Sequence, residues 1–177
     1  MLAFLGTFRR RTSGVFQMIR NLLFGHKDVV SSIEIRGDTE FCEFTKKALL
    51  LLKTKCFSSF DLINRHLEFI VEGRGETALT SEFGGAMLAL DGKEVKNMTE
   101  TWLAALLAYN AFQAKLCHEY KSRHKSVFKV PASIYCGEET WEFMYECFQK
   151  VGGSYDELQH LAEFIKTERD KIEKETK

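Results

Sequence analysis

Apolar and polar residues alternate with a helical period along most of the chain and with a strand period over a few short stretches. The helical period predicts about five helices, over residues 38–53, 58–72, 99–120, 138–151 and 156–173. Residues 31–36 alternate Ile33 and Ile35 with polar neighbours, which predicts a half-buried strand. Two short apolar runs between glycines, 77–83 and 86–90, predict an antiparallel hairpin.

These elements predict an α+β fold. We expect a small, mostly antiparallel sheet, formed by residues 31–36 and the 76–90 hairpin and packed against the long helix at 99–120. Asp38 is a candidate N-cap, and Asn97 with Glu100 resembles a capping box. Asp91-Gly92 is typical of a hairpin turn.

Length and charge indicate one globular domain. The chain has 177 residues, 45% of them hydrophobic, and a formal net charge of zero. This length is enough to bury a hydrophobic core, and neutrality argues against a nucleic-acid binder that relies on electrostatic attraction. We place the domain at residues 28–177, with a charged C-terminal end that frays.

Residues 1–27 form a basic leader with five Lys or Arg residues and no acidic residue. Val15, Ile19, Leu22 and Leu23 give residues 15–24 an apolar stripe, as in an amphipathic helix. Three alternatives remain for the leader: a helix packed on the domain, a segment that contacts a membrane surface or a partner, or a cleaved targeting sequence. We expect it to be peripheral. The stretch is too short to span a bilayer.

The cysteines favour a reducing, intracellular compartment. The chain has five, at positions 42, 56, 117, 136 and 147. An odd number at wide spacing without a C-x-x-C pair indicates free thiols. A cysteine-dependent hydrolase would need Cys117 or Cys136 to meet a histidine in space.

His118-Glu119 matches the first two residues of the zinc motif H-E-x-x-H, which needs its second histidine four residues after the first. That position holds Ser122, and the next histidine is His124. At about 100° per residue, His124 points about 240° around the helix from His118. The pair is therefore not this zinc motif.

The long helix resembles a known family. Residues 102–116, WLAALLAYNAFQAKL, are similar to the active-site helix of small zinc metallopeptidases of the HExxH class. Residues 137–152 are similar to the second helix of this family, which presents an acidic third ligand, and residues 33–53 resemble its strand-and-helix preface. The resemblance covers about residues 31–165 and implies a zincin-like fold.

The resemblance places the first histidine slot on Tyr109, the glutamate slot on Asn110 and the second histidine slot on Gln113, with Glu138 or Glu139 as the acidic ligand. A phenol and an amide bind Zn²⁺ poorly, and Asn110 cannot accept and return a proton as a carboxylate does. We therefore expect no metal, no other cofactor and no catalysis at this relic cleft.

Two functional hypotheses follow. The first is a metal-free pseudo-peptidase that uses the relic cleft to bind or regulate an unidentified protein or peptide. The second is an active hydrolase with a rearranged site, using a thiol nucleophile or a metal held by His118, His124 and the Glu138–Glu139 pair. Without the resemblance, Tyr109, Asn110 and Gln113 would be only a polar helix face or a buried hydrogen-bonded cluster.

Overall fold

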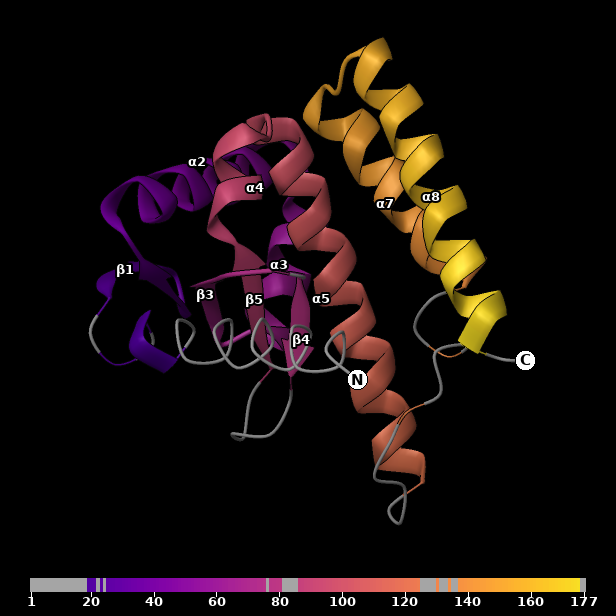
Figure 1. Ribbon diagram of the computed structural model, residues 1–177, viewed down its shortest axis with the longest axis horizontal. Helices are drawn as coiled ribbons and strands as arrows, with labels where there is room; N and C mark the ends of the chain where they lie inside the picture. The colour runs from indigo at the N-terminus through magenta and orange to yellow at the C-terminus, as the bar shows by residue number, and fades with distance from the viewer. Residues whose placement is uncertain are drawn as a thin grey trace, which may run out of the picture.

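The computed structural model shows an α+β fold, as predicted (Figure 1). It describes residues 19–21, 23, 25–75, 77–80, 86–124, 130, 134 and 137–175. A five-stranded sheet lies at one end of the molecule, and a pair of helices lies at the other. The long helix α5 (Glu100–Arg123) runs between them. Within the described part of the chain, every helix is too short or too polar to cross a membrane.

The described elements have well-defined bounds. The strands are β1 His26–Val30, β2 Ile33–Gly37, β3 Phe69–Gly73, β4 Ala78–Thr80 and β5 Met87–Asp91. The helices besides α5 are α2 Thr39–Lys55, α3 Phe57–His66, α4 Gly92–Asn97, α7 Glu138–Val151 and α8 Tyr155–Glu175.

The sheet is mixed, which corrects the expectation of a mostly antiparallel one. Its strand order is β1-β2-β3-β5-β4. The predicted hairpin is confirmed, because β4 and β5 are antiparallel, and β1 and β2 form a second antiparallel pair. The central pairs, β2 with β3 and β3 with β5, are parallel. Helices α2 and α3 supply the long crossover that a parallel pair of strands requires.

The helix predicted over residues 58–72 is wrong in its second half. Helix α3 ends at His66, and Phe69–Gly73 is the central strand β3. Ile70 and Val71 are both fully buried although they point to opposite faces of the sheet. A strand buried on both faces is a continuous apolar run without alternation, so its pattern also fits a buried helix.

The turn signals were also partly misassigned. Asp91 does not form a hairpin turn; its carboxylate caps α4 by accepting hydrogen bonds from the main-chain N–H groups of Lys93 and Glu94. The unpredicted hairpin turn is at Ser31, which has a φ of 59°. A Cβ at Gly92 would clash with the Glu72 side chain, which would have to shift to make room.

The domain boundary placed between residues 27 and 28 falls inside β1, where His26 pairs with Gly37 and Lys27 with Arg36. Just before this strand, the buried Asn21 donates a hydrogen bond of 2.9 Å to the main-chain oxygen of Glu72. Residues 1–18, most of the predicted leader, lie outside the described residues.

One hydrophobic core joins the sheet to the helices. Its most deeply buried sheet side chains are Ile33, Ile35, Ile70, Leu88 and Leu90, each at most 1% exposed. Side chains of α2, α3, α4, α5, α7 and α8 pack against them. Burying a side chain of this size contributes about 1.5–3 kcal/mol, so this core fixes the position of α5.

The helix ends show which capping signals were interpreted correctly. Asp38 caps α2 as predicted, accepting a hydrogen bond of 2.8 Å from the N–H of Phe41. Helix α5 is capped by Thr99 and not by the predicted box at Asn97 and Glu100. Helix α7 matches its predicted range of 138–151 and ends at Gly152, whose φ of 90° is left-handed.

Candidate functional site

Helix α5 presents an aromatic stripe to α7 and α8. Trp102 packs edge-on against Phe148 of α7 and Phe164 of α8, with ring centroids 5.9 and 6.2 Å apart. Phe112 stacks on Phe143 of α7 at 4.6 Å. Such pairs are worth about 0.5–1.5 kcal/mol beyond the area that they bury. The stripe therefore joins the last two helices to α5.

The three slot residues lie within this buried part of α5. Tyr109, Asn110 and Gln113 are 3%, 4% and 7% exposed. The Tyr109 ring packs edge-on against Phe164 of α8, with centroids 5.8 Å apart. The Asn110 side-chain amide donates a hydrogen bond of 2.8 Å to the main-chain oxygen of Leu106, one turn back in the same helix. The slot residues are thus engaged in packing and in a local hydrogen bond.

Glu138 and Glu139 differ from the slot residues in exposure. Both are exposed in the first turn of α7, the helix that packs most extensively on α5. The structure thus places Tyr109, Asn110 and Gln113 together in the interior, and the two glutamates at the surface of the neighbouring helix.

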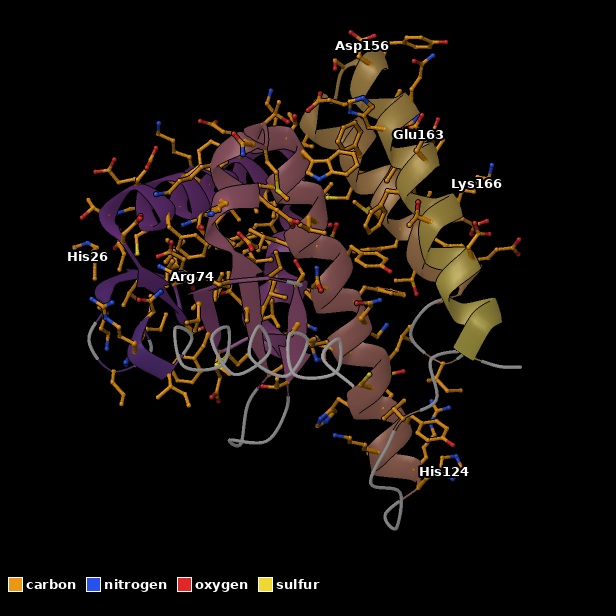
Figure 2. The ribbon with its side chains drawn as sticks, in the orientation of Figure 1. His26, Arg74, His124, Asp156, Glu163 and Lys166 are labelled. Carbon is orange, nitrogen blue, oxygen red and sulfur yellow. The ribbon has the colours of Figure 1, made fainter. Side chains whose placement is uncertain are left out.

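Helix α8 covers the slot region. Its partly buried stripe runs through Glu157, Leu158, Leu161, Phe164 and Ile165. Phe164 contacts both Trp102 and Tyr109. Figure 2 shows Glu163 and Lys166 on the opposite side of α8, facing solvent. The sequence prediction missed the role of Phe164, although the apolar period of residues 156–173 already placed it on the inner face of this helix.

A hydrogen-bonded carboxylate fixes the start of α8. Glu157 accepts hydrogen bonds from the hydroxyls of Thr99 and Thr101 at the start of α5, and from the Ser154 N–H at 2.7 Å. Burial alone would raise the pKa of Glu157, but these hydrogen bonds outweigh it and hold the pKa at about 2. The Ser154 hydroxyl in turn accepts a hydrogen bond from the Glu157 N–H. The two residues therefore form a capping box, which matches the sequence motif S-x-x-E.

An open groove of about 500 Å³ lies between α7 and α8. Helix α7 contributes Glu138, Trp141, Glu142, Tyr145, Glu146 and Gln149 to its walls. Helix α8 contributes Ile165. Of the residues predicted for the site, Glu138 is the one found in this groove. The other α7 members follow the period of one helical face, a pattern that was readable in the sequence but was not linked to binding.

The histidines proposed for a rearranged metal site have separate neighbours. His118 lies beside His66 of α3, with ring centroids 6.4 Å apart. His124, at the far end of α5, contacts Tyr120 at 4.5 Å (Figure 2). Burial is the main cause that lowers the pKa of His66, and the nearby His118 lowers it further. Among the residues that the structure describes, no group of three or more His, Cys, Asp or Glu side chains is arranged to hold a metal ion.

The described cysteines are free thiols in different environments. They are Cys42, Cys56, Cys117 and Cys147. Burial raises the pKa of Cys117, and it raises that of Cys147 to about 12, which disfavours the thiolate needed for nucleophilic attack. The pKa of Cys56 is lowered despite burial, because Ser59 contacts its sulfur at 3.1 Å. Cys136, the other nucleophile considered, lies outside the described residues.

Comparisons with protein families, with curated proteins and with solved structures found no match to this chain.

Proposed function

We propose that this chain is a non-catalytic, metal-free protein with a zincin-like helix, and that it acts as a binding or regulatory module. The proposal rests on which side chains occupy the three slot positions of α5 and on what they contact. Tyr109, Asn110 and Gln113 are buried, with Tyr109 packed against Phe164 of α8 and Asn110 bonded to its own helix.

The chemistry of these side chains supports the same conclusion. Zinc peptidases need two imidazoles one helical turn apart, a general base and an open position for water. Tyr109 and Gln113 keep the spacing of four residues but offer a phenol and an amide. Phe164 packs edge-on against Tyr109, so a ring of α8 lies beside this position. We infer that this region serves structure, and that binding takes place on the surface around it.

Restoring the zinc chemistry tests the proposal. The variant Tyr109→His/Asn110→Glu/Gln113→His rebuilds two imidazoles and a base, with Glu138 or Glu139 as the acidic ligand. A second variant adds Phe164→Ala to clear space for the ion and its water. We expect zinc binding, measured by competition with a chromogenic chelator, in the second variant and more weakly in the first. Wild type should bind none specifically.

The matched control carries Tyr109→His, Asn110→Glu and Phe164→Ala but keeps Gln113. With one imidazole removed, its zinc affinity should fall at least about tenfold below that of the second variant. Equal zinc affinity in the control and the restored variant, with both folded by circular dichroism, would show that Tyr109 and Gln113 do not share a metal position. Stoichiometric zinc in wild type that is lost in His118→Ala would instead support the rearranged hydrolase.

A further inference from the structure

The outer face of α7 carries a regular series of acidic side chains along the groove. Glu138, Glu142 and Glu146 are all exposed and recur every fourth residue. On a helix this spacing places one carboxylate about every 6 Å along the axis, over a total of about 12 Å. A row of this length exceeds a small metabolite and matches about two turns of a second helix.

The walls of the groove between these carboxylates are apolar. The Tyr145 side chain is 42% exposed, and Trp141 and Ile165 form the inner wall. Exposed aromatic surface beside a groove is typical of sites where a partner inserts hydrophobic side chains. Aromatic rings next to carboxylates also favour Lys and Arg, whose aliphatic stems pack on the ring while the charge meets the acid.

Glu142 and Glu146 have little competing charge within the described part of the chain. Glu142 makes no ion pair there. Glu146 pairs with Lys150 at 3.5 Å, but both side chains are more than half exposed, so solvent screens the pair and it contributes little. An incoming cation can therefore gain from both positions. The same negative charge repels phosphate, which excludes nucleic acid and acidic membrane as occupants.

We propose that the α7–α8 groove, lined by Glu138, Trp141, Glu142, Tyr145, Glu146, Gln149 and Ile165, binds a basic amphipathic helix of a partner protein. The partner places Lys or Arg at every fourth position against the glutamates and an apolar stripe against Tyr145 and Ile165, the helix-in-groove mode of recognition. This inference rests on the proposed binding function and names the class of its partner.

The experiment uses a fluorescein-labelled peptide of about 18 residues, long enough to form a helix, with lysine at every fourth position of one stripe and leucine on the next. A second peptide replaces each lysine with glutamate. We expect fluorescence anisotropy to show saturable binding of the lysine peptide to the full chain, weakened by added salt, and none of the glutamate peptide.

Variants locate the binding. Glu142→Lys/Glu146→Lys should weaken the lysine peptide at least about tenfold, and Tyr145→Ala should weaken it without changing its salt dependence. The matched control is Glu163→Lys, the same change at an exposed position on the solvent face of α8, and its affinity should stay within about twofold of wild type. Chemical shifts of wild-type amides on titration should move along residues 138–149.

Three results would overturn the inference: no saturable binding by wild type, an equal loss of affinity in Glu163→Lys, or shift changes confined to other elements. A self-association that Glu142→Lys/Glu146→Lys abolishes would assign the groove to a second copy and would overturn it too. None of these outcomes affects the zinc measurements, so failure of the groove inference and failure of the metal-free assignment are distinguishable.

Discussion

The two sides of helix α5 are built from different side chains. On the side toward α2 and α3, Glu100 of α5 forms an ion pair with Lys47 of α2, and His118 of α5 contacts His66 of α3. Between Glu100 and His118, the same stripe of α5 carries small and aliphatic residues: Leu103, Ala104, Leu107, Ala111 and Ala114. The other side, toward α7 and α8, carries the rings of Trp102, Tyr109 and Phe112.

This difference separates two kinds of packing within one hydrophobic core. Alanines allow helices to approach closely, and the side toward α2 and α3 is sealed, with Leu103 and Leu107 at 0% exposure. The aromatic side packs against the fully buried Phe148 and the half-buried Phe143 and Phe164. Tyr109 lies on the aromatic side, where it packs against Phe164.

The comparison predicts its largest effect on the sealed side. Leu107→Ala should lower the free energy of unfolding by about 3 kcal/mol, because it leaves a cavity that the packed helices α2 and α3 cannot close. Urea unfolding followed by circular dichroism measures it.

The matched control for this core variant is Leu50→Ala, the same chemical change at a side chain that is 43% exposed on α2. It should change the free energy of unfolding by less than about 0.5 kcal/mol. A loss in Leu107→Ala no larger than in the control would mean that this side of α5 is not the core.

A smaller loss is expected on the aromatic side. Phe164→Ala removes the edge contacts to Trp102 and Tyr109 from a half-buried position, and it should cost about 2 kcal/mol. Amide exchange should increase along α8 while α2 and α3 keep their protection.

Tyr155→Ala, on the same helix and 74% exposed, is the control for Phe164→Ala and should have almost no effect. If Phe164→Ala instead opened α2 and α3 as readily as α8, the two sides of α5 would form one cooperative unit and the contrast between them would fail.

Sequence reasoning predicted the parts of the fold whose local signals agree with their tertiary setting. Helices α2 and α7 were predicted within about two residues because the apolar period, the Asp38 cap and the Gly152 stop agree. Strand β3 was missed because it is buried on both faces, so no alternation remained to distinguish it from a helix. Strand pairing depends on residues that are distant in sequence. Local patterns therefore could not predict that β2, β3 and β5 are parallel.

The candidate site was predictable to a smaller extent. Spacing alone placed Tyr109 and Gln113 on one helical face, but it could not show that Phe164, more than fifty residues later, packs on Tyr109. The acidic residues were sought as metal ligands in the first turn of α7. Local patterns could not show that Glu142 and Glu146, which continue the acidic repeat, line a groove together with Ile165 of α8.

The smallest effect concerns the polar link between the start of α8 and the start of α5. The carboxylate of Glu157 accepts hydrogen bonds from Thr99, Thr101 and Ser154 that hold its pKa at about 2, below the ordinary value of 4.5. A lowered pKa in the folded state stabilises the fold above pH 4.5, and this stabilisation is lost as the pH falls from about 4.5 toward 2. After allowance for solvent screening it amounts to about 1 kcal/mol at pH 7.

Glu157→Gln should therefore lower the free energy of unfolding by about 1 kcal/mol at pH 7, and its difference from wild type should shrink as the pH is lowered through 4 toward 3. The control is Glu163→Gln on the solvent face of α8, which should match wild type across this range. Urea unfolding at several pH values measures both variants. A difference for Glu157→Gln that stays constant with pH would show that the carboxylate charge does not tie α8 to α5, and that the aromatic rings hold this end of the helix by themselves.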